Sequence, residues 1–450
     1  MRRSPTLPAV PIRLGAASLC GLAVAIGAGS LRAQEGGAGG KTLSFDLSQR
    51  FEASENYDLD DDSQGTTYIA STGLSLDFRS VTRGHSLDLG LGGALRRIDA
   101  PDESDSESFG FYDPSYSIGY TRTGPGARFS ADASLRTSEI SFLRRLDSFF
   151  DDEGALVIPD DIDDLDDLDG TGTRQILSYG ATLALRQDTP FAVTARARVT
   201  DTSYEDTTSG GLFDERRTVL GLGARMSLTE IHTLSTDLSY TRVEDEDPAE
   251  PELGTYLGLD TTLSAARPDG ALSATLGINE TDDGTRLSAS VGIDRERPLG
   301  GLGATIGVSR GSDGDLGLIG SVDYRRAFPQ GVITLEGRRS FTDGGNDTGI
   351  AGGGNDGNET VTIVSATYAR ELTPLTSLSA NASFASTTDT GSDDTASDLS
   401  LGLSLSRSLD PNWAVTGGVS ATFFKDEGED DWSQSESVYV TLGRSFDWRF

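Results

Sequence analysis

The chain has 450 residues, a formal net charge of −34, and only 36% hydrophobic residues. Such an excess of acid argues against a nucleic-acid partner, because affinity for nucleic acid comes from neutralising phosphates with Lys and Arg. A composition this polar is also typical of disordered chains, but the regular order of the apolar residues contradicts that interpretation.

The N-terminus has the features of a secretory signal peptide. Arginines precede an uncharged, small-residue apolar stretch at 14–30, and Ala33 offers a small residue before a cut. We therefore expect residues 1–33 to be removed. The alternative is a membrane anchor, but the stretch is rich in Gly and Ala and no longer than a signal needs.

The rest of the chain is expected to be one domain. The single cysteine, Cys20, leaves with the signal, so the mature chain carries no thiol chemistry. Residues 34–40 are rich in Gly and are interpreted as a flexible tether. The domain then covers residues 41–450, without an internal linker.

Apolar residues alternate strictly with polar ones along most of this domain. Clear examples are Leu43–Leu47, Leu74–Phe78, Leu87–Leu91, Ala131–Leu135, Leu220–Leu228, Leu287–Ile293 and Leu399–Leu405. Alternate side chains of a strand point to opposite faces, so each segment has one apolar and one polar face. The expected strand centres are 46, 73, 91, 116, 133, 181, 197, 222, 237, 260, 275, 290, 306, 320, 336, 365, 381, 401, 419 and 443.

The connections between these strands alternate in length. Short turns include Val81–Gly84, Gly124–Gly126, Gln187–Pro190, Pro268–Gly270, Pro298–Gly301, Phe328–Gly331 and Asp410–Asn412. Longer acidic loops lie at 55–65, 99–107, 141–173, 205–214, 244–253, 343–358, 389–395 and 426–434. A soluble sandwich also alternates, but short turns at one rim and long loops at the other are typical of membrane barrels. We predict an all-β, transmembrane antiparallel up-and-down barrel of about 20 strands (18–22), with periplasmic turns and extracellular loops.

The last ten residues carry the most specific motif. Val438, Val440, Leu442, Phe446, Trp448 and Phe450 share one face of the final strand. The segment resembles the assembly signal of Gram-negative outer-membrane barrels, with Thr441, Gly443, Phe446 and Trp448 at the motif positions and Phe450 closing the chain. The resemblance implies recognition by the barrel assembly machinery and residence in the bacterial cell outer membrane, among its lipid and lipopolysaccharide.

A barrel of this size is too wide for side chains to fill. By strand parity, the interior receives Asp46, Asp88, Asp132, Asp237, Asp260 and Asp294. The tether is too short to hold the plug domain that TonB-dependent transporters carry, so we expect a water-filled lumen and a porin-like channel for passive diffusion of small solutes or ions. The alternative is a surface-binding barrel, or one associated with polysaccharide export, without channel activity.

The longest loop, 141–173, is the third of the long loops. In general porins the third loop folds into the lumen and narrows it, and the topology here is similar. We expect a constriction in which loop acids face wall arginines, as in pores that select by charge. The candidates are Asp160, Asp161, Asp163, Asp164, Asp166, Asp167 and Asp169 on the loop, and Arg96, Arg136, Arg186, Arg196, Arg198 and Arg225 on the wall. The alternative is an external, solvated loop whose neighbouring arginines pair with lumenal Asp residues.

Other chemistry finds little support in the sequence. Asp160–Gly170 has the acid density for calcium, but its register does not fit an EF-hand. The two histidines, His85 and His232, lie beside short turns without an evident catalytic partner. We therefore expect no enzymatic activity and no cofactor. Small residues on lipid faces, such as Ala380 and Ala382, leave a homo-oligomer open.

Overall fold

The computed structural model describes residues 40–450 with gaps. The gaps are 58, 60–62, 64, 102–108, 144–145, 147–148, 150–155, 157–171, 208–211, 246–252, 282–283, 313, 344–357, 390–394 and 427–430. The predicted signal peptide and residues 34–39 of the predicted tether lie outside the described residues. Gly40, the last residue assigned to the tether, is the first residue of β1.

The described chain folds into one sheet of twenty strands. They are β1 (Gly40–Glu55), β2 (Thr66–Thr82), β3 (His85–Asp99), β4 (Phe109–Gly124), β5 (Ala127–Glu139), β6 (Thr173–Leu185), β7 (Phe191–Glu205), β8 (Glu215–Ser227), β9 (His232–Asp245), β10 (Leu253–Arg267), β11 (Gly270–Thr281), β12 (Gly284–Arg297), β13 (Gly300–Arg310), β14 (Leu316–Phe328), β15 (Gly331–Asp343), β16 (Asn358–Thr373), β17 (Thr376–Asp389), β18 (Thr395–Ser408), β19 (Trp413–Lys425) and β20 (Ser433–Arg449). Every predicted strand centre falls inside one of these strands, so the predicted count is confirmed.

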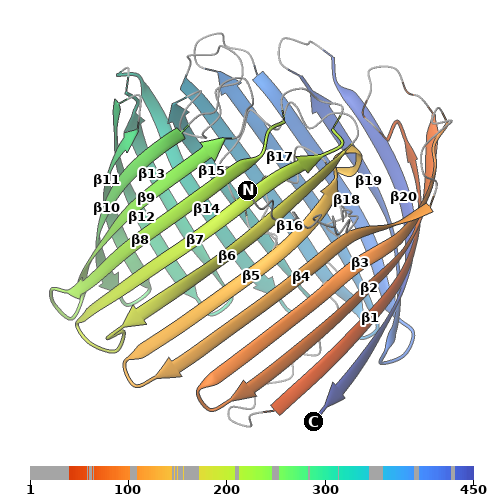
Figure 1. Cartoon of the computed structure of the whole chain (residues 1–450), viewed down its shortest axis with the longest axis horizontal. Helices are drawn as coiled ribbons and strands as arrows, with labels where there is room; N and C mark the ends of the chain where they lie inside the picture. The colour runs from red at the N-terminus through yellow and green to blue at the C-terminus, as the bar shows by residue number, and fades with distance from the viewer. Residues whose placement is uncertain are drawn as a thin grey trace, which may run out of the picture.

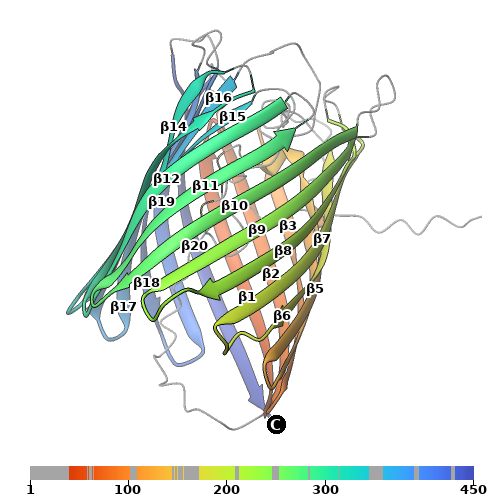
Figure 2. The ribbon, with the colours of Figure 1, turned by 90° about the vertical axis from the view of Figure 1, so that its left-hand side faces the viewer.

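The sheet closes on itself. Each strand pairs antiparallel with its neighbours in the chain, and β1 pairs with β20 from Thr42–Arg449 to Glu55–Glu436. Closure gives every strand a partner on both sides, which a sheet needs in lipid because lipid offers no hydrogen bonds. The strands tilt strongly around the barrel, as Figure 1 and Figure 2 show from two directions.

The two faces of the sheet differ in the way the alternation predicts. Leu276 (64% exposed), Val291 (59%) and Ile306 (59%) point outward from neighbouring strands. The residues between them, among them Ser288, Ser290 and Gly307, point inward. The barrel is therefore apolar outside and polar inside, the arrangement of a sheet surrounded by hydrocarbon. Within the described residues, no helix is long and apolar enough to cross a membrane.

Short turns define one rim of the barrel, called here the short-turn rim. Pro125 and Gly126 (φ +70°) occupy the centre of the β4–β5 turn, a pairing that suits a type II turn. In the β18–β19 turn, Asp410 Oδ1 accepts hydrogen bonds from the backbone N–H groups of Asn412 (2.8 Å) and Trp413 (2.9 Å). The C-terminus lies at this rim (Figure 1). The opposite rim, where β1 ends and β20 begins, is the long-loop rim.

Candidate functional site

An apolar cluster crosses the lumen near the long-loop rim. It joins buried residues of the β5–β6 connection to the inner wall on the far side. Its members are Ile140, Leu146, Phe149 and Leu156 of the connection, Leu212 before β8, and Val361, Ile363 and Ala385 of β16 and β17, with Leu143 and Tyr204 packed against them. We call this set the lumenal cluster. Phe149, Val361 and Ile363 have no exposed surface.

The inward position of the wall residues follows from strand register. Val364 pairs with Phe384 on the outer face, so Ile363 and Ala385, which pair with each other, face the lumen. β5 and β16 are eleven strands apart in chain order in a ring of twenty, so the contact spans the barrel. The described cluster residues of the connection, which begins with the 3-10 turn Ile140–Phe142, therefore lie within the lumen.

Burial of apolar side chains holds this connection in place. A fully buried Phe or Leu side chain stabilises by about 1.5–3 kcal/mol relative to an exposed one. The sequence signal for this contact is a break in the alternation of β16. Val364 faces outward as expected, but Val361 and Ile363 are apolar residues on the polar, inward face. The apolar residues within the acidic loop were the matching signal, and sequence reasoning missed both.

A buried ion pair lies on the inner face of β3 and β4. Arg96 Nη2 is 2.6 Å from Asp113 Oδ2, and the two side chains are 8% and 2% exposed. The Arg96 guanidinium also lies 5.5 Å from the centre of the Tyr112 ring. Arg96 was predicted as a constriction cation, but its charge is already matched by Asp113, so it is poorly placed to meet a permeating ion.

Arginines gather on the inner face of β5–β8, called here the arginine wall. They are Arg128, Arg136, Arg174, Arg196, Arg198, Arg217 and Arg225. Within these four strands the inward acids are Asp132 and Glu215. The wall therefore carries net positive charge although the whole chain is strongly acidic.

Arg196 and Arg198 are neighbours on this wall. Arg198 donates to Asp132 Oδ2 and to Ser178 Oγ, each at 2.9 Å. Arg196 is exposed to the lumen, and no carboxylate among the described residues pairs with it. Its side chain lies across Gly221 of β8, its cross-strand partner.

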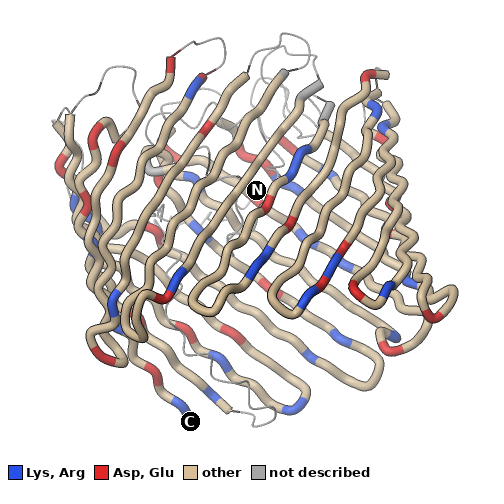
Figure 3. The backbone as a smooth tube through the Cα atoms, turned by 180° about the vertical axis from the view of Figure 1, so that it is seen from behind, with Lys and Arg blue, Asp and Glu red and all other residues tan. Residues whose placement is uncertain are grey.

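The wall on the other side of the lumen carries mainly neutral polar side chains. The inner faces of β17–β19, called here the hydroxyl wall, carry Ser379, Asn381, Ser383, Ser400, Ser404, Ser406, Thr416, Ser420 and Thr422. Figure 3 shows basic and acidic positions scattered along the backbone of the barrel, whereas β18 and β19 carry theirs toward the strand ends, at Asp398, Arg407 and Lys425. Among the described inward side chains of this wall, Asp398 is the charged one, and it is buried.

The other predicted constriction residues divide into three groups. Arg136 faces inward near the end of β5, and Arg225 faces inward near the short-turn rim, where it donates to the Gln187 carbonyl (2.9 Å). Arg186 lies beyond the end of β6 in a turn, 5.9 Å from the Phe191 ring, and not on an inward strand position. The acids Asp160, Asp161, Asp163, Asp164, Asp166, Asp167 and Asp169 lie outside the described residues.

The C-terminal motif residues lie on β20 with the predicted alternation. Thr441 and Gly443 face the lumen, whereas Phe446 and Trp448 face outward and stack with ring centres 6.1 Å apart. Arg444 shares the outer face, and its guanidinium lies 4.3 Å from the Phe446 ring centre and 5.0 Å from that of Trp413. Flanking aromatic rings thus accommodate the one cation of this face.

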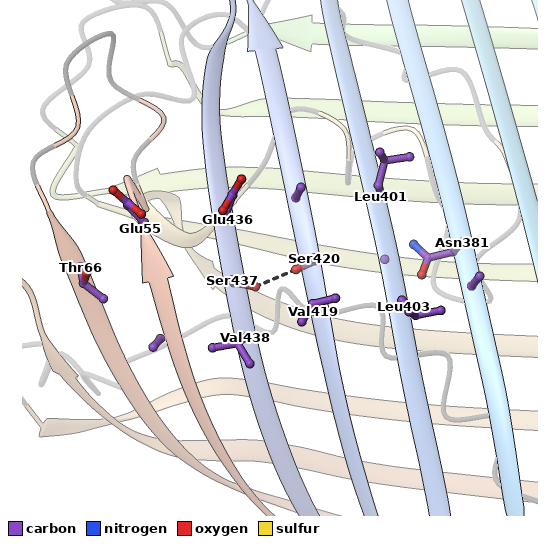
Figure 4. A pocket seen from close by; sticks show the side chains of 14 residues that line it. Glu55, Thr66, Asn381, Leu401, Leu403, Val419, Ser420, Glu436, Ser437 and Val438 are labelled. Carbon is purple, nitrogen blue, oxygen red and sulfur yellow. Dashed lines mark hydrogen bonds between the residues drawn. The ribbon is translucent and has the colours of Figure 1, made fainter.

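A depression of about 750 Å³ lies on the outer wall, away from the lumen. Small residues of β1, β17 and β19 make it, namely Ala53, Ala380 and Ala421. Figure 4 shows Glu55 and Glu436 to the left of Leu401 and Leu403, with Val438 below Glu436. Ala380 was one of the residues proposed for contacts between protomers, and the oligomeric state stays a prediction.

Other chemistry has little structural support among the described residues. No group of three or more His, Cys, Asp or Glu side chains there could hold a metal ion. Both histidines lie at the short-turn rim, where His85 Nδ1 is 2.8 Å from Tyr120 Oη and His232 Nδ1 is 3.0 Å from Thr229 Oγ1. The predicted lack of catalysis stays a prediction.

No family model and no curated protein matches the chain. Among solved structures, a variant of the ferric enterobactin receptor PfeA from Pseudomonas aeruginosa, in complex with enterobactin, superimposes with a TM-score of 0.54 and 11% identity, over 91% of this chain and 82% of that one. The copper transporter OprC gives 0.50 and 10%, over 91% and 81%. OpdQ from Pseudomonas aeruginosa gives 0.40 and 10%, over 91% and 98%. The chain has the fold of outer-membrane β-barrel proteins, and its closed, outwardly apolar sheet fits the bacterial outer membrane.

Proposed function

We propose that this protein is a passive channel through which small polar solutes and ions cross the outer membrane. The observation that carries the proposal is the lumenal cluster, which draws the β5–β6 connection across an otherwise polar lumen. A connection anchored on both sides narrows the passage while the polar wall below it stays wet. That the fold is shared with a copper transporter and with a ferric enterobactin receptor supports a role in solute passage.

Charge selection is the second part of the proposal. The arginine wall faces the hydroxyl wall, so a permeating ion meets positive charge on one side and neutral dipoles on the other. In the sequence, the seven candidate acids from Asp160 to Asp169 lie between Leu156 of the lumenal cluster and Thr173, the first residue of β6. Rings or rows of fixed charge select permeating ions by sign, so we expect these acids to act with the arginines.

Planar-bilayer recording of the purified protein tests both parts. We expect discrete conductance steps, and we expect replacement of the seven candidate acids from Asp160 to Asp169 by Asn to raise the permeability of anions relative to cations. Ion selectivity that does not change would contradict the constriction, while leaving the channel itself standing. A complete lack of conductance would instead favour the surface-binding or polysaccharide-export alternative.

A further inference from the structure

Three consecutive hairpins repeat one kind of turn at the short-turn rim. The turns are Arg267-Pro268-Asp269-Gly270, Arg297-Pro298-Leu299-Gly300 and Phe328-Pro329-Gln330-Gly331. In each turn the carbonyl of the third residue accepts a hydrogen bond from the backbone of the next strand after the hairpin. Asp269 accepts from Glu296 (2.9 Å), Leu299 from Ala327 (2.7 Å) and Gln330 from Glu371 (2.8 Å). The three turns are therefore structurally equivalent, although their third residues differ.

In the first two turns the glycine separates two outward arginines. Gly270 pairs with Arg267 on one side and Arg295 on the other, and Gly300 pairs in the same way with Arg297 and Arg326. Neighbouring strands lie about 4.8 Å apart, so the two arginines of a pair start about 10 Å apart with no side chain between them. A Cβ atom on either glycine would overlap a backbone carbonyl oxygen, that of Asp294 or Arg325, so these positions require glycine. We call the two spaces the Gly270 gap and the Gly300 gap.

The two gaps differ in whether the protein supplies an anion of its own. Asp269 leans toward Arg295 from the first turn, with Oδ2 3.5 Å from Arg295 Nε, and so places a carboxylate beside the Gly270 gap. The equivalent residue of the second turn is Leu299, which is uncharged and 65% exposed. Arg297 and Arg326 are both exposed, and no carboxylate among the described residues pairs with either. The Gly300 gap therefore has two guanidinium groups where the Gly270 gap has two and a carboxylate.

The Gly300 gap lies where the apolar outer face meets the short-turn rim. The Arg326 guanidinium lies 5.3 Å from the centre of the Phe328 ring, which is 42% exposed, and Tyr324 shares the outward face one pair deeper. Aromatic residues at strand ends mark the level of the lipid headgroups. The acids of the same strands, Asp294, Glu296 and Asp323, occupy inward positions, so the sheet separates them from the gap.

We infer that Arg297 and Arg326 bind the phosphate group of a phospholipid in the membrane leaflet at the short-turn rim, and that Gly300 leaves the space for it. Guanidinium groups donate paired, charge-assisted hydrogen bonds that match phosphate oxygens. The Asp269 carboxylate shows, at the equivalent gap, that an anion fits beside the second arginine of such a pair. The acyl chains of the lipid lie along the outward residues below Gly300, Leu302 and Ile306. The site is outside the lumen, so it does not depend on the proposed channel function.

Native mass spectrometry of the refolded barrel, released from a neutral detergent, counts bound lipids directly. The probe is dimyristoyl phosphatidylglycerol, and the control is dimyristoylglycerol, which has the same acyl chains without the phosphate. We expect the phospholipid to bind and the control lipid to bind much less. We expect Arg326→Gln to weaken phospholipid binding about fivefold, the scale of one solvent-exposed ion pair. Equal binding of the two lipids, or equal binding to Arg326→Gln, overturns the site.

Leu299→Asp tests the site through the difference between the two turns, and Leu299→Asn is its matched control. The aspartate gives the Gly300 gap a carboxylate of its own, as Asp269 does at the Gly270 gap, so we expect phospholipid binding to weaken at least as much as in Arg326→Gln. The asparagine has nearly the same size and no charge, so we expect it to bind as the unmodified protein does. Equal losses in the two variants would mean that the apolar turn and not the phosphate holds the lipid, which overturns the site.

Asp269→Leu makes the reverse change, because it removes the carboxylate from the Gly270 gap. We expect this variant to bind one more phospholipid than the unmodified protein, since Arg267 and Arg295 then match the arginines of the Gly300 gap. An unchanged number of bound lipids would overturn the gap as the binding feature. Inorganic phosphate added at the same concentration as the lipid should not displace it, because free phosphate lacks the contacts of the acyl chains. Complete displacement would show that the ligand is free phosphate, which overturns the lipid site.

Discussion

The arginine wall and the hydroxyl wall have the same apolar pattern on their outer faces but differ in charge on their inner faces. On β7 and β8 the outward residues include Val193, Ala195 and Leu222, and on β17 and β18 they include Ala380 and Leu403. The lipid requires only that this outer face be apolar. The inner face is free to vary, so β5–β8 carry arginines there, whereas β17–β19 carry mainly Ser and Thr. We therefore expect ion selectivity to depend on the inward residues and not on the outward ones.

Loss of the lumenal cluster should have the largest effect, because the cluster joins the β5–β6 connection, beside the arginine wall, to β16 and β17 on the other side of the lumen. Phe149→Ala removes a fully buried ring, a change that typically costs about 3–5 kcal/mol in a protein core. We expect the β5–β6 connection to detach from Ile363 and single-channel conductance to rise. Phe51→Ala, which removes an outward ring that is 59% exposed, is the control. Equal conductance of the two variants would contradict the role of the cluster.

Breaking the buried pair beside the arginine wall should affect stability and leave selectivity alone. Arg96→Leu removes the partner of the buried Asp113 carboxyl group, and breaking a buried ion pair in this way typically costs about 3–5 kcal/mol. We expect a lower urea midpoint of unfolding and an unchanged ratio of anion to cation permeability in the fraction that still folds. If the permeability ratio shifts as much as it does when the exposed Arg198 is replaced, Arg96 does contribute to ion selectivity.

Arg198→Gln weakens the arginine wall at its centre. The Arg198 charge is exposed and is partly matched by Asp132. We therefore expect the reversal potential in a salt gradient to shift modestly, in the direction of higher cation permeability relative to anions. The shift should be clear in about 0.1 M salt and nearly vanish in about 1 M salt, because the screening length falls from about 10 Å to about 3 Å. A shift independent of salt would point to altered pore shape and not to charge.

Asn381→Arg makes the opposite change, because it adds a positive charge to the hydroxyl wall. Asn381 lies over Gly402 on the hydroxyl wall, as Arg196 lies over Gly221 on the arginine wall. The new guanidinium has the same kind of glycine seat, so we expect anion preference to increase by about as much as Arg198→Gln reduces it. Thr416→Arg, on the same wall but without a glycine seat of this kind among its described contacts, serves as a comparison. No increase in either variant would argue that the hydroxyl wall is remote from the ion path.

The smallest effect is expected within the hydroxyl wall itself. Ser420 and Ser437 share a hydrogen bond of 2.7 Å on the inner face. Ser420→Ala removes one neutral bond, worth about 1 kcal/mol, and no charge. We expect a slightly lower urea midpoint and the same ion selectivity as the unmodified barrel. Selectivity that changes would mean that hydroxyl dipoles, and not only guanidinium charge, set the preference.

The sequence predicted the barrel well because the fold is governed by local alternation. Most of the twenty strands carry a period-two pattern of their own, and most of the short turns carry Pro, Gly or Asp, so little information from distant residues was required. Strand parity likewise placed Arg196 and Arg198 inward. Parity alone misplaced Arg186, because β6 ends at Leu185 and the pattern does not mark the last residue of a strand.

Contacts across the lumen could not be predicted in the same way. No period links Phe149 to Ile363, which are more than 200 residues apart in the chain. The seat under Arg196 requires the register of β7 against β8, which pairs position 196 with position 221. Alternation indicates which way each side chain points. It does not indicate which side chain lies across the lumen or on the neighbouring strand, and the candidate site depends on those contacts.

The seam between β1 and β20 has a consequence for how the barrel is made. It pairs Phe45 with Phe446 and Thr42 with Arg449, residues from opposite ends of the polypeptide. Contacts so remote in the chain are slow to form, because much of the intervening chain must be ordered first. A nascent molecule lacking its final strand would present two unpaired edges, which invite pairing with another copy. Shortening the chain by that strand should therefore yield aggregates and not a smaller pore.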